Sequence, residues 1–522
     1  MHQELLRDES RNIGYAESVS FPETEEDILE ILKYCRDKKL SLTVQGALTG
    51  LAAGAVPYGG HVVNLKRMNK VLAIDQIGEE FTLTCQPGLI LSELRKAIEL
   101  KHFNNPNFSE ASRKALAAIS KKGSYVFPPD PTEASASLGG MVACNASGAR
   151  TYFFGATREH ITRLRLILSD GRILDIKRGQ VKANGLKLEL PLTNGAVLKI
   201  DLPKYKMPAT KNAAGYYVAA DMDALDLFIG SDGTLGLIVE IDIKLQRAPE
   251  FTWGISTFWP DEKSAIDFVL AARQRIKNLT SLESFDYWAL ELLRQQREKG
   301  GIFSSLPFLP EDYAYCIYLE LQGDEEAKLL TALNQIKSLM DESGGDSSKT
   351  WVALNDTELT RLLFFRHAVP ESVNMLIDQR KRKYPDIAKL GTDMAVPDDR
   401  LVEIIEIYRR DLKEANLQAA SWGHIGDNHI HVNILPRNSE DYQRGKELYL
   451  RWAKKVTEMQ GTVSAEHGVG KSKANMLEIM YGSEHIEEMR RLKLSFDPWN
   501  LLSPGNLFAA KGGVGHAHSS DD

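Results

Sequence analysis

The amino-acid sequence predicts an α+β protein of two or three domains. Its 522 residues exceed what one hydrophobic core organises, because single cores stop growing beyond about 250–300 residues. Patterns typical of helices and of strands alternate along the N-terminal half, with Gly- and Ala-rich turns between them. Two histidine-bearing strings, GHIGDNHIH at 423–431 and SAEHG at 464–468, stand apart near the C-terminus. We therefore expect a Gly-rich first domain and a second part with a chemistry of its own.

Composition excludes several classes of function. The hydrophobic fraction of 43% and the charged fraction of 26% are typical of a soluble globular protein. A net charge of -7 argues against a nucleic-acid partner, which needs clustered Lys and Arg. No apolar run approaches the ~18 residues of a membrane span, and the charged start MHQELLRDES lacks the apolar core of a secretory signal. We expect a cytoplasmic protein without a transmembrane segment, and peripheral contact with the inner membrane stays open.

The four cysteines, Cys35, Cys85, Cys144 and Cys316, are scattered and form no CxxC pair. This spacing predicts buried structural thiols. It also predicts that a redox enzyme with this sequence carries no iron–sulfur cluster of its own.

The first elements alternate between helix and strand. Residues 21–38 open with Pro22 and a Thr-Glu-Glu cap, and their apolar positions then share one helical face. Residues 41–44, 61–65 and 81–88 have the composition of strands. This order predicts a β-α-β arrangement.

Small residues dominate the next part of the chain. Residues 127–150 are nearly free of bulky side chains, so they cannot build a core, and we expect their backbone to approach a ligand. Residues 164–174 read as a hairpin with Asp-Gly at the turn, and 227–245 as a Gly-rich turn that enters a strand. Arg247-Ala-Pro marks the predicted end of the first domain, 1–247.

The second half alternates helices and strands without such Gly clusters. Amphipathic patterns predict helices at 401–412 and 440–460, and residues 496–508 resemble a docked C-terminal segment. We expect a domain at 248–460 and an active-site segment at 461–509. The polar tail 510–522 is predicted to be disordered, so its His516 and His518 are not proposed as ligands.

Three Gly-rich stretches, 46–54, 139–148 and 230–236, indicate a bound phosphate group. Backbone N–H groups in such turns bind pyrophosphate because no side chain blocks the approach. None of the three is a Rossmann GxGxxG or a Walker A motif. Their occurrence together within 200 residues favours a nucleotide cofactor other than NAD.

The histidine strings predict a metal site. Gly426 to Asn428 form a turn, so His424 faces the strand that follows, where His429 and His431 share one face by period-two alternation. Either of these two could partner His424. Glu466 adds a carboxylate, which makes a three-ligand site, and His467 is left over for proton transfer.

The strings QGALTGL, FPPDPTEASASLGGMVACNASGAR, KNAAGYY and FIGSDGTLGLIVE, in this order, resemble the PCMH-type FAD-binding domain of the vanillyl-alcohol oxidase superfamily. The histidine strings resemble its D-lactate, D-2-hydroxyglutarate and glycolate dehydrogenase branch. The resemblance runs from about residue 7 to 508. It implies FAD between two α+β subdomains, then an α+β (ferredoxin-like) cap domain and a C-terminal segment that completes the active site.

The resemblance also implies the residues that contact FAD. Its pyrophosphate would lie on the loops at 46–51 and 137–148, and the implied contacts are Gly46, Thr49, Gly50, Leu51, Pro129, Asp130, Ser137, Gly139, Asn145, Ala146, Gly148, Gly230, Gly236 and Ile238. The usual Arg-Gly-Gly-Gly-Thr-Gly is Gln45-Gly46-Ala47-Leu48-Thr49-Gly50 here, so Leu48 must point away from the phosphates. No His or Cys stands where the family attaches flavin, which predicts non-covalent FAD.

The family pattern GHxGDGNxH aligns without a gap and implies His424, His431 and Glu466 as metal ligands and His467 as the base. Zinc suits this set best, and manganese, iron or cobalt would also fit. His429 stands where the family has Asn, and Asn428 stands where the family has Gly. Whether His429 alters the surroundings of the ligands or adds a fourth one stays open.

A substrate carboxylate needs a cation. Arg366 matches the Arg that the family uses for this purpose, and Lys389 is a second candidate. The Thr that D-2-hydroxyglutarate enzymes carry four residues after the Arg is Pro370 here. This substitution favours lactate or a similar monocarboxylate over a dicarboxylate.

Together these features predict an FAD- and metal-dependent D-2-hydroxyacid dehydrogenase, with D-lactate to pyruvate as the favoured reaction. Electrons would pass to an external acceptor such as a quinone, a cytochrome, an electron-transfer flavoprotein or an iron–sulfur subunit. A homodimer is compatible with the sequence. Two alternatives stand beside this reading: the flavin subunit of a multi-subunit glycolate or lactate oxidase, and a metal-dependent hydrolase without flavin.

Overall fold

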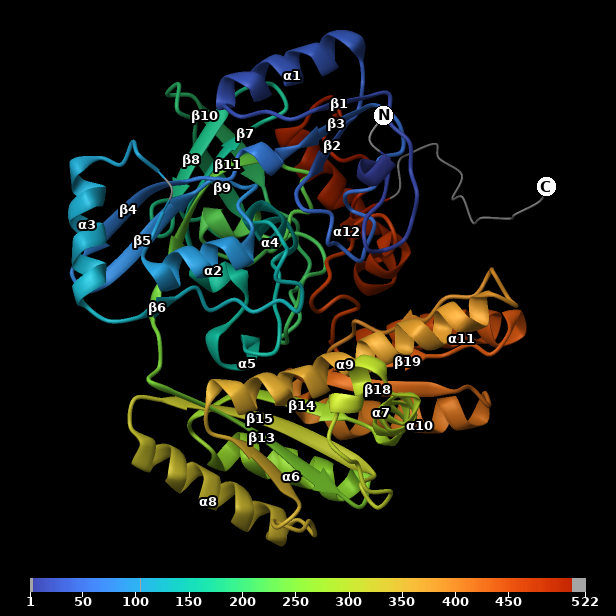
Figure 1. Cartoon of the computed structure of the whole chain (residues 1–522). Helices are drawn as coiled ribbons and strands as arrows, with labels where there is room; N and C mark the ends of the chain where they lie inside the picture. The colour runs from blue at the N-terminus through green and yellow to red at the C-terminus, as the bar shows by residue number, and fades with distance from the viewer. Residues whose placement is uncertain (1–2, 104, 509–522) are drawn as a thin grey trace.

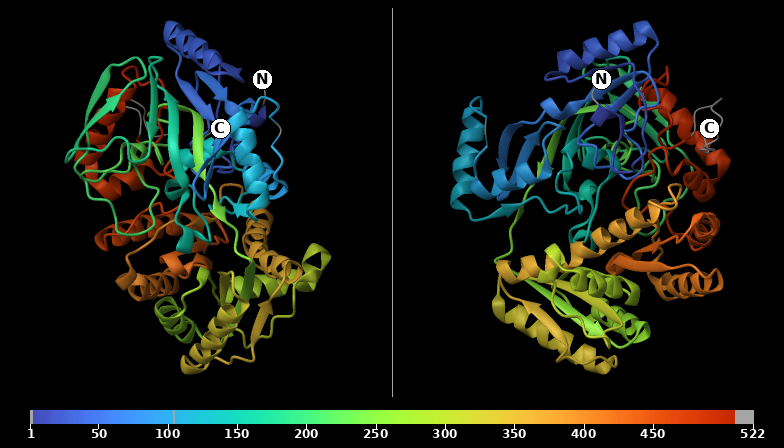
Figure 2. Two further views of the ribbon diagram at one scale, coloured as in Figure 1. Left: turned by 90° about the vertical axis from the view of Figure 1, so that its left-hand side faces the viewer. Right: turned by 45° about the vertical axis from the view of Figure 1, so that its right-hand side comes forward.

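Two bodies, one above the other in Figure 1, make up the structure. The computed structural model describes residues 3–103 and 105–508. The chain builds most of the upper body first, crosses to the lower body after residue 247, and returns to the upper body at its end (Figure 1). Figure 2 shows the same two bodies from two further sides. The predicted disordered tail, 510–522, lies outside the described residues.

A small parallel sheet carries the first Gly-rich loop. Helix α1 (Glu25–Lys38) begins at Thr24, whose side chain accepts from the backbone of Asp27 in a capping box, and it buries Ile28, Leu32 and Cys35. This confirms the predicted helix. The sheet has the order β1-β3-β2, with β1 (Ser18–Ser20), β2 (Leu42–Gln45) and β3 (His61–Asn64).

The second sheet of the upper body is antiparallel, with the order β4-β5-β11-β7-β8. The predicted hairpin at 164–174 is formed by β7 and β8, which pair antiparallel. The strands are β4 (Val71–Ile77), β5 (Glu80–Cys85), β7 (Ile161–Ile167), β8 (Ile173–Lys177) and β11 (Leu237–Lys244). The helices beside them are α2 (Leu91–Leu100), α3 (Glu110–Lys121), α4 (Leu138–Cys144) and α5 (Thr151–Phe154). The remaining strands are β6 (Tyr125–Val126), β9 (Lys187–Pro191), β10 (Val197–Asp201) and β12 (Gln246–Arg247).

The lower body is built on a seven-stranded sheet of the order β16-β13-β15-β14-β18-β19-β17. Its first four strands, with α6 after β13 and α8 after β15, have the βαββαβ connection of a ferredoxin-like unit. The strands are β13 (Phe251–Trp259), β14 (Leu279–Phe285), β15 (Tyr315–Gly323), β16 (Thr350–Ala353), β17 (Leu390–Gly391), β18 (Ala419–His424) and β19 (His429–Ile434). The predicted α+β fold class is confirmed.

Helices cover both faces of this sheet, and α8 lies on the side away from the upper body (Figure 1). The helices are α6 (Glu262–Arg275), α7 (Tyr287–Lys299), α8 (Glu326–Glu342), α9 (Asp356–Lys381), α10 (Leu401–Glu414) and α11 (Ser439–Glu458). The last two confirm the helices predicted at 401–412 and 440–460. None of the helices among the described residues combines the length and apolarity that crossing a membrane requires.

The C-terminal segment docks on the upper body, as predicted. Helix α12 (Ala474–Phe496) places Phe496 against Phe228. The backbone of Leu42 in β2 then donates to Leu501 and accepts from Ser503, so residues 501–503 extend the free edge of the first sheet. Residues almost 460 positions apart are thereby neighbours.

Candidate functional site

One hairpin places three imidazoles on one face of the large sheet. Strands β18 and β19 pair antiparallel, with His424 opposite His429 and Trp422 opposite His431. The turn between them is the short helix η7 (Ile425–Asp427), closed by Asn428 in a left-handed conformation at φ 53. Because alternate residues of a strand share a face, the rings of His424, His429 and His431 project the same way.

The loop between α11 and α12 carries Glu466 to these rings. Its position is fixed by Asp393, a buried carboxylate that accepts from the backbone N–H groups of Glu466 and His467, each at 3.1 Å. Asp393 also accepts from the Ser464 hydroxyl at 2.7 Å and from the Lys473 ammonium at 2.5 Å. A single side chain therefore orders the whole loop.

The four side chains converge on one point. Glu466 Oε2 lies 3.0 Å from His424 Nε2, 3.6 Å from His429 Nδ1 and 3.9 Å from His431 Nε2. One ligand atom from each residue lies within 4.8 Å of all the others. The Nδ1 atom of His429 is buried and, among the described residues, has no hydrogen-bond partner. Imidazole nitrogens and a carboxylate oxygen in this arrangement fit a divalent transition-metal ion.

The second ring nitrogen of each histidine faces an oxygen. His424 Nδ1 lies 2.5 Å from Glu283 Oε1, His431 Nδ1 lies 2.8 Å from the backbone oxygen of Thr392, and His429 Nε2 lies 3.1 Å from Asp393 Oδ1. Such outer partners fix the tautomer and ring orientation of metal-binding histidines.

Burial and neighbouring charge set the protonation of these groups. Burial lowers the pKa of His429 to about 4, and burial with the nearby His429 holds the pKa of His431 well below its usual range. Both rings are therefore neutral at pH 7 and offer a lone pair. Burial also acts on His424, but the Glu283 carboxylate outweighs it and raises the pKa of His424 to about 9. The neighbouring carboxylates therefore favour the charged form of His424, whereas binding of a metal requires its neutral form.

His467 lies beside this cluster and lines the adjoining pocket together with Glu466. Its ring stacks on that of His431, with centroids 5.5 Å apart, and its Nδ1 lies 3.5 Å from Asp393 Oδ2. Burial lowers the pKa of His467, although the charge of Asp393 opposes this. A neutral imidazole oriented by a carboxylate is suited to accept a proton.

Arg366 lies in α9 and joins the same network. Its Nε donates to Glu283 Oε2 at 2.7 Å, and the other oxygen of Glu283 contacts His424. The Arg366 side chain is 12% exposed, and its two terminal nitrogens make no hydrogen bond within residues 3–103 and 105–508. A guanidinium edge left free in a buried position can receive a carboxylate.

Lys389 is not brought to the cluster. Its side chain is exposed, and within the described ranges it makes no hydrogen bond or ion pair with any of the four converging residues. The cation that does approach them is Lys211, whose buried Nζ lies 3.5 Å from Glu466 Oε2 and 3.9 Å from Asp427 Oδ2.

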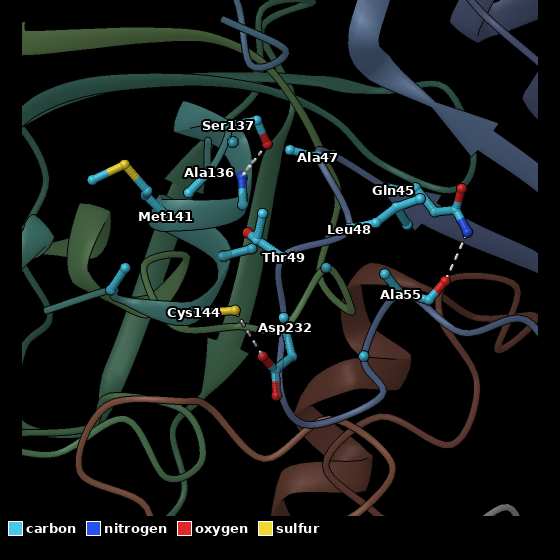
Figure 3. A pocket seen from close by; sticks show the side chains of 18 of the residues that line it. Gln45, Ala47, Leu48, Thr49, Ala55, Ala136, Ser137, Met141, Cys144 and Asp232 are labelled. Atoms are coloured by element: carbon cyan, nitrogen blue, oxygen red, sulfur yellow. Dashed lines mark hydrogen bonds between the residues drawn. The ribbon is translucent and has the colours of Figure 1, made fainter. Parts of the chain in front are cut away.

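The Gly-rich loops line a pocket in the upper body that ends at Glu466 and His467. Figure 3 shows the loop of Gln45 to Thr49 facing Ser137 and Met141 of the α4 region, with Cys144 and Asp232 at another side. Of the fourteen residues expected to contact FAD, nine line this pocket: Gly46, Thr49, Gly50, Leu51, Ser137, Gly139, Ala146, Gly236 and Ile238. The other five lie beyond its lining: Pro129, Asp130, Asn145, Gly148 and Gly230.

Two of the glycines allow parts of the chain to approach closely. A Cβ atom on Gly46 would lie 2.1 Å from Ser137 Oγ, so the first two Gly-rich loops meet at this point. A Cβ on Gly148 would lie 1.7 Å from the backbone oxygen of Asp130. Because these two glycines have no side chain, neighbouring segments of the upper body can touch there.

The substituted position Leu48 has φ 65, in the left-handed region that favours glycine. The loop thus keeps a glycine-like backbone although a leucine occupies it. Its backbone oxygen accepts from Glu9 at 3.2 Å, and Gln45 Nε2 donates to the oxygens of Leu5 and Ala55 at 2.8 Å each. These bonds hold the loop in place.

Sequence reasoning missed Asp393, Glu283 and Lys211. Glu283 lies in β14, where all seven residues are buried, and an acidic residue inside such a strand is itself a signal of a paired charge. Asp393 follows the short strand β17 in GTDMAVP, and Lys211 precedes the small residues of KNAAGYY. Their partners are 36 to 255 residues distant in sequence, so no local pattern reveals them.

The comparisons with known proteins agree with this geometry. Residues 249–507 match the C-terminal domain of FAD-linked oxidases, and residues 16–112 and 111–177 match an FAD-binding domain. The chain belongs to the FAD-linked oxidases of the PCMH-type fold, and it is an FAD-dependent oxidoreductase.

The relatives include three proteins that match over 94% of this chain. One is the probable mitochondrial D-lactate dehydrogenase of Danio rerio, 28% identical, with 84% of that protein covered. The others are the glycolate oxidase subunit GlcD of Bacillus subtilis, 26% identical with 89% covered, and the D-2-hydroxyglutarate dehydrogenase of Stutzerimonas stutzeri, 25% identical with 91% covered.

Solved structures share the fold at low sequence identity. The 4-ethylphenol oxidase of Gulosibacter chungangensis matches 96% of this chain and 92% of its own, with a TM-score of 0.61 at 14% identity. An alkyldihydroxyacetonephosphate synthase matches 93% of this chain and 75% of its own, with a TM-score of 0.59 at 15% identity.

Proposed function

We propose that this protein is an FAD- and divalent-metal-dependent dehydrogenase of a small D-2-hydroxyacid, with D-lactate to pyruvate as the favoured reaction. The observation that carries the proposal is the convergence of three imidazoles and Glu466 beside His467, at the end of the Gly-lined pocket. The names of the relatives support the substrate class, since they are D-lactate, glycolate and D-2-hydroxyglutarate enzymes.

FAD would bind non-covalently along the pocket of the upper body. The loop at 46–51 and the start of α4 would receive its pyrophosphate, because their backbone N–H groups are not shielded by side chains. The nine lining residues named above would contact it directly. Asp130, 2.8 Å from Arg95 and 4.0 Å from Arg150, would close the side nearest the lower body.

His424, His431 and Glu466 would hold the cation, for which zinc, manganese, iron and cobalt are candidates. Bound FAD supplies a hydride acceptor, and a bound divalent cation lowers the pKa of a hydroxyl that it polarises. This chain contributes the orientation of the ligands: Glu283 and Thr392 hold the second nitrogens of His424 and His431.

His467 would remove the hydroxyl proton of the substrate. Its Nδ1 faces Asp393, which leaves Nε2 as the nitrogen that accepts the proton. The Asp393 carboxylate would then stabilise the imidazolium that forms, as the carboxylate of a catalytic triad does. Because the ring stacks on His431, its plane is already fixed before substrate binds.

Arg366 would bind the substrate carboxylate through its two free nitrogens. Glu283 keeps the guanidinium in place and links it to His424, so the carboxylate anchor and the metal ligand are held by one residue. Pro370 lies one turn further along α9, where it offers no hydroxyl to a second carboxylate. This supports a monocarboxylate substrate.

A second candidate is the flavin subunit of a multi-subunit glycolate or lactate oxidase. The similarity to the GlcD subunit of Bacillus subtilis supports it. In that case an iron–sulfur partner would accept the electrons; otherwise a quinone, a cytochrome or an electron-transfer flavoprotein would. We propose a cytoplasmic protein, able to contact a membrane surface or to dimerise. A hydrolase without flavin is not supported, because the chain has an FAD-binding domain.

The test is an anaerobic absorption spectrum of the purified protein before and after addition of D-lactate. We expect flavin bands that bleach with D-lactate, persist with L-lactate, and no longer bleach after metal chelation. If only glycolate or D-2-hydroxyglutarate bleaches the flavin, that compound takes the place of D-lactate as the proposed substrate, and the proposed reaction type is unchanged. A flavin that no D-2-hydroxyacid reduces, even with an iron–sulfur partner present, would overturn the proposal.

A further inference from the structure

His429 is a buried imidazole that its surroundings do not satisfy. Its side chain is fully buried, and neither of its two ring nitrogens makes a hydrogen bond with any of the described residues. Leaving a buried polar atom unpaired costs about 1–3 kcal/mol. Its neighbours along β19, Ile430 and Val432, are buried apolar residues on the other face of the sheet. A polar ring here therefore needs a partner.

The unpaired nitrogen points to the centre of the cluster. His429 Nδ1 lies 3.6 Å from Glu466 Oε2, between the separations of 3.0 Å for His424 Nε2 and 3.9 Å for His431 Nε2. Ligands about 2.1 Å from one ion are about 3.0 Å apart when adjacent in an octahedron and about 4.2 Å apart when opposite. His429 meets this range as well as the other two histidines do.

The other ring nitrogen of His429, Nε2, faces the Asp393 carboxylate on the side away from the cluster. Its Nε2 lies 3.1 Å from Asp393 Oδ1, just as Glu283 stands behind His424 and the Thr392 carbonyl behind His431. An imidazole that donates its second N–H to a carboxylate presents the other nitrogen as a stronger ligand. Each ring therefore turns one nitrogen to the cluster and the other to an oxygen, but at His429 this second contact is an ion-pair separation of 3.1 Å and not a hydrogen bond.

We propose that His429 is a fourth protein ligand, so that the site is three histidines and one glutamate and takes a six-coordinate metal such as Mn²⁺, Fe²⁺ or Co²⁺ in preference to Zn²⁺. This inference rests on the proposed function, because the two coordination positions left over are those that the hydroxyl and the carboxylate of a 2-hydroxyacid would occupy.

Counting positions decides between the metals. Zinc prefers four ligands, and four protein ligands would close a tetrahedral site, whereas catalytic zinc keeps an open position. An octahedral ion with the same four protein ligands keeps two adjacent positions for a chelating substrate. A fourth ligand therefore changes which metal supports the reaction.

The test counts the coordinated histidines. The full-length FAD-loaded protein is stripped with a chelator, reloaded anaerobically with Co²⁺ and examined by proton NMR, in which the ring N–H of each coordinated imidazole gives a separate shifted signal that exchanges with solvent. We expect three such signals, and weak visible absorption bands typical of six-coordinate Co²⁺ when D-lactate or its product is bound.

The variant His429→Asn should show two signals and lose metal affinity by roughly tenfold or more. His102→Asn, at an exposed position of the upper body, is the matched control and should keep all three signals. Flavin absorbance and thermal unfolding show whether each variant is folded. The count in the unmodified protein needs no variant, so a misfolded His429→Asn leaves the test intact.

Two signals in both the unmodified protein and His429→Asn would overturn the fourth ligand, and so would a tetrahedral Co²⁺ spectrum in the presence of substrate. If the same sample is reduced by D-lactate in a metal-dependent way, the proposed function stands and this inference alone fails. Absence of any bound metal, with no reduction by any D-2-hydroxyacid, would overturn both.

Discussion

The side chains around the cluster work in pairs rather than singly. Glu283 contacts His424 with one oxygen and Arg366 with the other, and its pKa is held far below the ordinary range because these two cations outweigh the effect of burial. A buried charge of this kind is tolerated only while its partners remain. Replacing Arg366 or Glu283 should therefore affect the other residue as well.

Arg366→Lys keeps the positive charge but loses the planar fork. We expect kcat/KM for D-lactate to fall about 10- to 100-fold, chiefly through KM, because an ammonium cannot bind a carboxylate through two parallel hydrogen bonds. Steady-state kinetics with an artificial electron acceptor measures this. Arg361→Lys, at an exposed position of the same helix, is the control and should leave both constants unchanged. Equal kinetics for the two variants would remove Arg366 from the substrate site.

Glu283→Gln leaves the shape of the side chain but removes its charge. We expect the free energy of unfolding to fall by about 3–5 kcal/mol, because the buried Arg366 loses its counter-charge. Metal affinity should fall about 10- to 100-fold, because His424 loses its orienting carboxylate. Urea unfolding and a metal titration measure the two effects. The exposed Glu298→Gln is the control, and stability equal to that of the control would contradict the pairing.

Residue patterns predicted the site only as far as they were local. His424, Glu466 and His467 could be proposed because each belongs to a short string with a readable turn or strand, whereas the local pattern left His429 and His431 as alternatives. The sequence could not predict which ring nitrogen of His429 faces the cluster, because this depends on Asp393, 36 residues earlier in the chain. Charges that meet across such separations leave no periodic signal.

At the scale of elements, the pocket depends on contact between loops of different elements. The loop after β2 meets the start of α4 where Gly46 faces Ser137. Asn506 joins the same loop to the loop at 230–236 by donating to the backbone oxygens of Gly54 and Asp232. The strand before the first loop was predicted with an error of one residue at each end, whereas helix α4 was not predicted, because 127–150 showed only a run of small residues. The contacts between the loops were not predicted either, because they are set by tertiary packing.

Gly46→Ala should separate the first two Gly-rich loops. A Cβ atom there would lie 2.1 Å from Ser137 Oγ, so we expect the purified variant to contain much less FAD. The double variant Gly46→Ala, Ser137→Gly removes the obstructing side chain and should recover part of the FAD. Ser137→Gly alone is the control, because the Ser137 side chain also accepts from the backbone N–H of Gly140 and so caps the start of α4. The flavin-to-protein absorbance ratio measures all three, and no recovery in the double variant would contradict the close approach.

At the scale of the whole molecule, the cluster joins parts of the chain that belong to different layers. Two strands of the large sheet supply the histidines, and the loop before α12, whose helix packs on the upper body, supplies Glu466. The fold class was predictable because hydrophobic patterns and Gly-rich turns are continuous along the chain. The path of the C-terminal segment between the two bodies was not predictable, since its sequence indicates only that it docks.

Removal of the metal should therefore act on stability as well as on catalysis. We expect chelation to stop reduction by D-lactate while the flavin stays bound, because of the four converging residues only Glu466 also lines the pocket. Thermal unfolding should occur at a lower temperature, and restoring metal to about 100 times its dissociation constant should return about 2.7 kcal/mol. Chelator already saturated with metal is the control. An unchanged unfolding temperature would show that the cluster does not join these parts.

The pairing of Leu42 with residues 501–503 has a consequence for how the protein matures in the cell. A ribosome releases β2 almost 460 residues before the strand partner that completes its free edge. Loading of flavin should therefore follow synthesis of residues 501–503 and not accompany synthesis of β2. Nascent chains stalled before residue 500 would remain colourless, and a supply of flavin late in translation would matter more than one at its start.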